Sequence, residues 1–326
     1  MSLVRQTASL LATVLAVIVL SAAAHAQTYP SKPITFIIPY GAGGGTDSVA
    51  RILQDDIRKE FGQSIIIDNR PGANGAIGSA AAARVTPDGY TLLLTASSTF
   101  SVNPNLMKDI KYDQLNDFVP VGLFVRSPWM MVVHGKSPFK SVADVVKAAK
   151  ESPGKLSVGF WQSNVLVTGE MFQQAAGVQL LKVPYKSTVE AVSDLLGQRI
   201  DILFVDIQAV RAYIDAGTLR YLAATTANRV SIVPDVPTLV ESGYPSVVTD
   251  ASIILFAPSK TPRPIIERLH AGMVKVVSSS TDAREKLRGI GHEPTTMTLG
   301  ELDSFVRSEL ARWGEMIRSV GLAKDQ

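Results

Sequence analysis

The chain has 326 residues, no cysteine and a formal net charge of +3 at pH 7. The lack of cysteine excludes disulfides, thiolate metal sites and a cysteine nucleophile. So small a net charge, without a basic cluster interleaved with aromatic residues, argues against nucleic-acid binding. A hydrophobic content of 46% and a charged content of 19% are those of an ordinary globular protein. The length suggests two domains or one large domain.

Residues 1–26 are predicted to be a secretory signal peptide. Arg5 supplies a positive charge, residues 10–20 are almost purely apolar, and Ala24-His25-Ala26 has the small-x-small pattern of a cleavage site. The apolar run is shorter than the roughly 20 residues that a membrane span needs, so a membrane anchor is the weaker interpretation. We therefore expect a periplasmic chain that begins at Gln27. Loss of Arg5 lowers the formal charge from +3 to +2.

Beyond the leader, short apolar runs alternate with amphipathic stretches. Strands are expected at residues 34–39, 65–68, 90–95, 130–133, 155–159, 180–183, 202–206, 222–225 and 253–257. Helices are expected at residues 47–61, 79–85, 141–151, 165–176, 188–197, 210–216, 264–278 and 299–320. This rhythm predicts mainly parallel sheets that helices cover on both faces.

Two segments, at residues 124–128 and 249–252, are predicted to cross between two lobes. Lobe 1 would consist of residues 27–126 plus 251–326, and lobe 2 of residues 127–250. The predicted fold class is therefore α/β with two lobes. Each lobe would have a central sheet flanked by helices, and two strands would form the hinge.

A glycine-rich loop follows the first predicted strand. It reads Pro39-Tyr40-Gly41-Ala42-Gly43-Gly44-Gly45-Thr46-Asp47 and leads into a helix. Such a loop lets backbone N–H groups approach an anion, so it is expected to capture a carboxylate. A plain tight turn is the alternative, whereas a dinucleotide fingerprint would need a third glycine where Thr46 stands. The candidate ligand-binding residues of this loop are Tyr40, Gly43, Gly44, Thr46 and Asp47. Asp47 is expected to cap the helix and order the loop without touching the ligand.

Other predicted strands also end in polar or aromatic residues. Ligands bind at the carboxyl ends of strands in open α/β sheets, so these positions are candidates too. One ring of the Phe160-Trp161 pair is expected in the core, and the other could line the cleft. Asp206 could cap a helix or bind the ligand, and Tyr185 could close the cleft or lie on the surface. The candidates from these loops are Ser97, Ser98, Phe160, Trp161, Gln162, Ser163, Tyr185 and Asp206.

The sequence contains few residue patterns that are typical of a catalytic site. His134, His270 and His292 lie outside the candidate loops and are interpreted as packing or surface residues. Neither a G-x-S-x-G motif nor an H-E-x-x-H motif occurs. We therefore predict no catalytic residue, no metal site and no cofactor. A secreted hydrolase on a two-lobed scaffold is the alternative function.

Several segments together resemble the tripartite tricarboxylate receptor family of periplasmic solute-binding proteins, also called TctC-like or Bug proteins. The resemblance runs from Tyr29 to the C-terminus and rests on sequence motifs. These are Tyr29-Pro30-Ser31-Lys32-Pro33-Ile34, Pro39-x-x-x-Gly43-Gly44-x-x-Asp47, Asp68-Asn69-Arg70-Pro71-Gly72-Ala73, Pro87-Asp88-Gly89-Tyr90-Thr91, Val183-Pro184-Tyr185-Lys186, Leu219-Arg220-Tyr221-Leu222-Ala223, Pro234-Asp235-Val236-Pro237-Thr238 and Phe256-Ala257-Pro258.

The resemblance implies a type II periplasmic-binding-protein fold and an extracytoplasmic receptor, often for a carboxylate, that can serve a membrane permease. We expect a monomer that binds a small carboxylate and has such a permease or a sensor kinase as partner. The family's ligand site maps onto residues 40–47, 159–164 and the region of Asp206. In lobe 2 the family has a longer loop rich in glycine and serine, where this chain carries Phe160 and Trp161. Two rings there favour a flatter ligand, such as an aromatic carboxylate.

Overall fold

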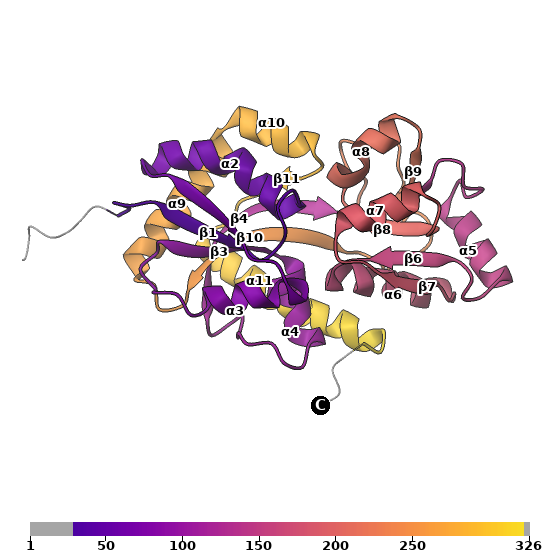
Figure 1. Ribbon diagram of the computed structural model, residues 1–326, viewed down its shortest axis with the longest axis horizontal. Helices are drawn as coiled ribbons and strands as arrows, with labels where there is room; N and C mark the ends of the chain where they lie inside the picture. Colours follow the sequence, from indigo (N-terminus) through magenta and orange to yellow (C-terminus); the bar gives the residue numbers. More distant parts are fainter. Residues whose placement is uncertain (1–28, 323–326) are drawn as a thin grey trace, which may run out of the picture.

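The structure is a computed structural model that describes residues 29–322, so the predicted signal peptide lies outside the described residues. Two lobes lie side by side, each built on one sheet (Figure 1). The lobe 1 sheet has the order β11-β4-β10-β3-β1-β2. Its strands are β1 (Ile34–Ile38), β2 (Ile65–Asn69), β3 (Thr91–Ala96), β4 (Phe118–Pro128), β10 (Asp250–Pro258) and β11 (Glu293–Pro294).

Helices cover both faces of the lobe 1 sheet because its strands are apolar on both faces. Leu92 and Leu94 of β3 join one hydrophobic cluster, and Leu93, pointing the other way, joins a second. The first cluster draws on α2 (Gly45–Phe61), α9 (Arg263–Ser279) and α10 (Thr281–Gly289). The second draws on α3 (Ala76–Ala82), the π-helical turn η2 (Ser98–Val102) and α11 (Leu299–Ser319). Two short helical segments, η1 (Ala73–Gly75) and α4 (Asn103–Leu106), complete the lobe.

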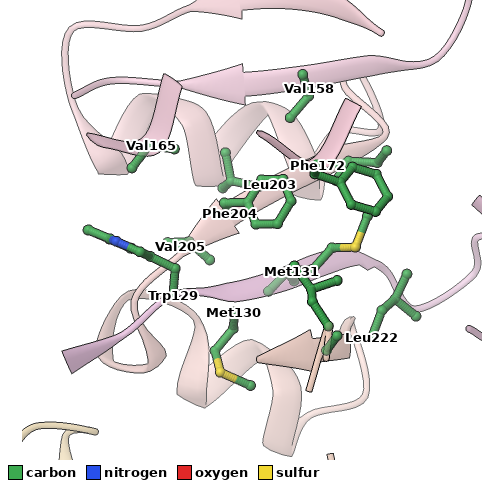
Figure 2. Close-up of a cluster of buried hydrophobic side chains, with 14 of the residues drawn as sticks. Trp129, Met130, Met131, Val158, Val165, Phe172, Leu203, Phe204, Val205 and Leu222 are labelled. Atoms are coloured by element: carbon green, nitrogen blue, oxygen red, sulfur yellow. The ribbon is translucent and has the colours of Figure 1, made fainter. Parts of the chain in front are cut away.

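Lobe 2 is a five-stranded sheet in the order β7-β6-β8-β5-β9. Its strands are β5 (Met130–His134), β6 (Ser157–Phe160), β7 (Leu181–Pro184), β8 (Ile202–Val205) and β9 (Leu219–Ala224), and its helices are α5 (Val142–Glu151), α6 (Ser163–Ala176), α7 (Thr188–Leu196) and α8 (Ile207–Asp215). Strand β5 is antiparallel to both of its neighbours, and the other four strands run in one direction. Their carboxyl ends therefore share one edge. Figure 2 shows the apolar side chains that these strands bury.

Two strands connect the lobes, as the crossing segments predicted. Strands β4 and β10 pair in antiparallel fashion over their length, with Asp250 opposite Pro128 and Ser252 opposite Arg126 (Figure 1). Helix α11 also reaches both lobes, because its first half packs in a lobe 1 cluster and Trp313 packs in the lobe 2 cluster. The division of the chain at residues 126 and 250 stays a prediction.

Most predicted elements are present, but some short helices were not predicted. Helix α10 buries only Ala283 and Leu287, one turn apart, so its apolar stripe is too narrow to give a periodic signal. The turn η2 and helix α4 are short and follow directly on β3. Within residues 29–322, no helix combines the length and apolar character needed to cross a membrane.

Candidate functional site

The strand-end loops of the two lobes face one another and make direct contacts. Ser163 Oγ, at the start of α6, donates to Asn103 Oδ1 of lobe 1 at 2.7 Å. Gln208 Nε2, in the first turn of α8, donates to Ser48 Oγ of α2 at 2.7 Å. Because each contact joins the start of a helix in one lobe to the other lobe, the edges that carry the predicted site residues come together.

The glycine loop ends in a helix that no side chain caps. Gly44 is the N-cap residue of α2, and the first backbone hydrogen bond runs from Ser48 N to Gly44 O. The N–H groups of the first turn are therefore not used within the helix. Gly43 has a φ of +82°, a conformation that favours glycine and turns the chain into the helix. The loop thus presents an end of a helix that attracts anions.

The expectation that Asp47 caps α2 is wrong. Asp47 is the third residue of the helix, and it reaches back to accept a hydrogen bond from Gly43 N at 2.9 Å. It also pairs with Arg51 at 2.8 Å and accepts from Asn69 Nδ2 at 3.1 Å. Burial alone would raise the pKa of Asp47, but these hydrogen bonds outweigh it and lower the pKa. Asp47 therefore orders the loop, as expected, by tying it to α2 and β2.

Asp47→Ala is expected to lower the free energy of unfolding by about 2 kcal/mol, because a buried carboxylate that accepts several hydrogen bonds contributes more than a simple cap. Urea denaturation would measure this. Arg51→Ala is the matched control. The Arg51 side chain is 53% exposed, and its loss should cost under about 1 kcal/mol. Equal losses for both variants would contradict the role assigned to the Gly43 and Asn69 contacts.

Tyr40 and the residues after β3 form a hydrogen-bonded group. The Tyr40 hydroxyl lies 2.9 Å from Ser98 Oγ and 2.6 Å from Thr99 Oγ1. Ser98 and Ser97 are fully buried, and Ser97 Oγ has no partner in the described part of the chain. The structure thus brings Tyr40 and Ser98 together, and the Ser97 hydroxyl has no hydrogen bond to any described residue.

The aromatic pair of lobe 2 is mostly packed into that lobe. Trp161 is 7% exposed and meets Trp129 edge-on, with ring centroids 6.1 Å apart. Phe160 is half-buried against the same cluster. Gln162 is half-buried and precedes α6 without capping it. Trp161 is therefore the core ring of the pair, and Phe160 is the ring with more exposed surface.

Asp206 and Tyr185 are tied to lobe 2 itself. Asp206 caps α8 by accepting from Ala209 N at 3.0 Å, which was one of its two predicted roles. Burial raises the pKa of Asp206. The Tyr185 hydroxyl donates to Asp194 at 2.9 Å, and burial together with this carboxylate raises the pKa of Tyr185 to about 12. Both residues order the edge that faces lobe 1.

Several buried polar atoms around this edge and the two crossing strands lack a hydrogen-bond partner among the described residues. They belong to Ser97, Trp129, Asn164, Gln208, Ser252 and His292. A buried polar group without a partner costs about 1–3 kcal/mol, and such groups are few in native proteins. Similar atoms also occur on Ser79, Gln114, Tyr221 and Thr261, so these groups do not by themselves define a site. A molecule or water bound between the lobes would supply the hydrogen bonds that those near the lobe junction lack.

His292 is a buried residue close to the crossing strands, in agreement with its interpretation as a packing residue. It is 3% exposed and lies just before β11, where its Nδ1 contacts Ser127 Oγ of the crossing strand β4. Burial lowers its pKa to about 4, so the imidazole is neutral at pH 7. Strand β11 has only two residues, so no periodic pattern pointed to a buried position here.

A pocket of about 760 Å³ lies beside the two crossing strands. Its walls include the loop at residues 226–232, which follows β9, and residues 291–293 of lobe 1. The charged groups on its floor are paired with one another: Arg126 binds Asp250 at 2.7 Å, and Arg312 binds Glu309 at 2.7 Å. None of the glycine-loop residues lines it, but His292, which also lies near the start of α2, is part of its wall.

The described residues offer little for catalysis or metal binding. Within residues 29–322, no group of three or more His, Asp or Glu side chains could hold a metal ion. Ser127 and His292 are in contact, but no carboxylate in this part of the chain bonds to the Nε2 atom of His292. The third member of a hydrolytic triad is therefore missing from the described residues.

Comparison with known proteins identifies the family. The receptor profile of the tripartite tricarboxylate transporter family matches residues 49–322. The chain is 33% identical over 305 residues to protein BugT of Bordetella pertussis, and the match covers 93% of each chain.

Two similar solved structures contain carboxylates. A protein of R. palustris with adipate is 31% identical, with a TM-score of 0.86 and coverage of 90% of this chain and 99% of that one. MatC of Rhodopseudomonas palustris with bound malate is 26% identical, with a TM-score of 0.82 and coverage of 89% and 100%. The two-lobed periplasmic-binding-protein fold is thereby confirmed.

Proposed function

Because the chain belongs to the tripartite tricarboxylate transporter receptor family, we propose that it is a periplasmic receptor that captures a small carboxylate between its lobes. One observation carries the proposal. The first turn of α2, whose N-cap is Gly44, lies where the lobes meet, near buried polar atoms that have no hydrogen-bond partner within residues 29–322. Backbone N–H groups at the start of a helix favour the binding of a carboxylate. The bound ligand would also supply hydrogen bonds to the buried polar groups around it. Adipate and malate in two relatives support the same ligand class.

The proposed binding residues lie on both lobes, so capture involves closure of one lobe on the other. Lobe 1 contributes Tyr40, Gly43, Gly44, Thr46, Asp47, Ser97 and Ser98, and lobe 2 contributes Phe160, Trp161, Gln162, Ser163, Tyr185 and Asp206. Of these, Asp47, Trp161, Tyr185 and Asp206 act by ordering the loops, since their side chains are engaged within their own lobes. An aromatic carboxylate would lie on the exposed part of Phe160.

We further propose that the receptor works as a monomer and delivers its ligand to a membrane permease of the tripartite type or to a sensor kinase. The family is one of solute-binding receptors, and this supports a role in uptake. The signal peptide predicted at residues 1–26 would place the mature chain in the periplasm.

Thermal-shift measurement of the mature chain against about 100 mono- and dicarboxylates would test the function. A ligand that binds only the folded state stabilises it by about 2.7 kcal/mol at 100 times its Kd, which is readily measured. We expect at least one carboxylate to raise Tm without being consumed. A response to sugars or cations but to no carboxylate would refute the ligand class. Turnover of the stabilising compound would favour the hydrolase alternative.

A further inference from the structure

The histidine before β11 lies at the junction of the crossing strands, the glycine loop and lobe 2. Its Nδ1 atom contacts Ser127 Oγ, and its Nε2 atom has no partner in the described part of the chain. Of the three described histidines, His134 Nδ1 accepts from Lys136 N and His270 Nδ1 lies 2.8 Å from Val121 O. Only for His292 is a ring nitrogen both buried and unpartnered in that part of the chain.

The unpartnered nitrogen lies against the start of α2. A Cβ atom built on Gly45 would stand 3.7 Å from both Nε2 and Cε1 of His292, so this edge of the imidazole faces the first residue of the helix. The N–H groups of that turn are the donors that favour an anion. An imidazole nitrogen beside them adds a side-chain donor to a set otherwise made of backbone groups.

Helix α8 of lobe 2 covers His292 and the start of α2 in this structure. A Cβ atom on Gly291 would come within 2.6 Å of Ile207 Cβ, so the backbone before His292 packs directly on the start of α8. The neighbouring contact between Gln208 and Ser48 joins α8 to α2. Separation of α8 from these residues would open the space in front of the imidazole, and their return would enclose it.

We propose that His292 is a ligand-binding residue whose Nε2–H donates to the carboxylate held at the start of α2. In this arrangement the Ser127 hydroxyl donates to Nδ1, which leaves the proton of the neutral ring on Nε2. The histidine therefore recognises the carboxylate through a hydrogen bond from Nε2. This inference rests on the proposed receptor function and adds a residue to its site.

Three variants separate a donor at Nε2 from simple packing. Glutamine can place an amide N–H near the Nε2 position, asparagine reaches only the Nδ1 position, and phenylalanine fills the space without a donor. Binding of adipate, malate and benzoate would be measured by calorimetry. We expect Kd to rise about tenfold or more for His292→Asn and His292→Phe, and to change far less for His292→Gln. Equal effects of all three variants would overturn the proposal.

A spectroscopic measurement on the unmodified chain tests the contact without relying on the affinity of any variant. The ¹⁵N resonances of the His292 ring, assigned by their loss in His292→Gln, should shift when a bound probe engages Nε2, while those of His134 and His270 stay in place. A probe that stabilises the protein but leaves the His292 resonances unmoved would refute this inference and leave the receptor function intact. If no carboxylate of the thermal-shift screen binds at all, the proposal of a carboxylate receptor itself fails.

Discussion

Trp161→Ala is expected to lower the free energy of unfolding by about 3–5 kcal/mol, the usual cost of removing a large buried aromatic ring. Trp161 is 7% exposed and packs edge-on against Trp129, which follows directly on the crossing strand β4. Loss of the indole would leave a cavity between the cleft loop and the hinge. Urea denaturation followed by circular dichroism would measure the loss.

Phe160→Ala is the matched control, because Phe160 adjoins Trp161 in sequence but is only half-buried. It should cost clearly less stability than Trp161→Ala. If Trp161→Ala instead cost under about 1 kcal/mol and abolished binding, the indole would be a ligand contact and not a core residue.

Trp161 is also expected to report ligand binding, since it lies in a loop at the mouth of lobe 2. Fluorescence titration of Trp161→Phe and Trp129→Phe would test this. If the ligand-dependent signal survives in Trp161→Phe and vanishes in Trp129→Phe, the signal comes from motion of the hinge. Because the rings of Trp129 and Trp161 pack against each other, either substitution can alter the fluorescence of the remaining ring. The size of the ligand-dependent fluorescence change in each variant therefore decides which tryptophan gives the signal.

The sequence predicted the elements well where hydrophobic periodicity was strong. Strands such as β1 and β8 are continuous apolar runs, and helices such as α5 carry a capping box, here between Ser141 and Asp144. The two crossing segments, at residues 124–128 and 249–252, were predicted from their position between the series of strands and helices assigned to each lobe. The glycine loop was recognisable because strand, glycines and helix follow one another within a few residues.

The partners of individual side chains could not be predicted, because they depend on tertiary contacts. Asp47 was adjacent to the helix start and was expected to cap it, but Gly44 takes the cap position and Asn69 of β2 shares the carboxylate. The contact of Ser163 with Asn103 joins residues 60 apart in the chain. His292 and Ser127 are 165 residues apart, and the burial of this histidine depends on the pairing of β11 with β4 and on packing against α2 and α8.

Acidification should destabilise the protein through His292 by about 2–3 kcal/mol between pH 7.5 and pH 4.5. Burial lowers the pKa of the folded-state imidazole from 6.5 to about 4. Below pH 6.5 the unfolded chain therefore binds a proton that the folded chain does not, and stability falls as pH falls. The contribution is fully present above pH 6.5 and is lost by about pH 4. Urea denaturation at the two pH values would measure it.

His292→Gln is the variant that isolates this effect, because glutamine keeps a polar side chain that does not titrate. Carboxylates with lowered pKa values, such as Asp47, lose stability in acid as well, but they do so equally in both proteins. The difference between the two proteins should therefore change by about 2–3 kcal/mol in favour of the variant as pH falls from 7.5 to 4.5. A difference that is the same at both pH values would show that the imidazole takes up its proton near pH 6.5 in the folded protein. His292 would then be open to water in solution, and its unpartnered nitrogen would be hydrated before any ligand arrives.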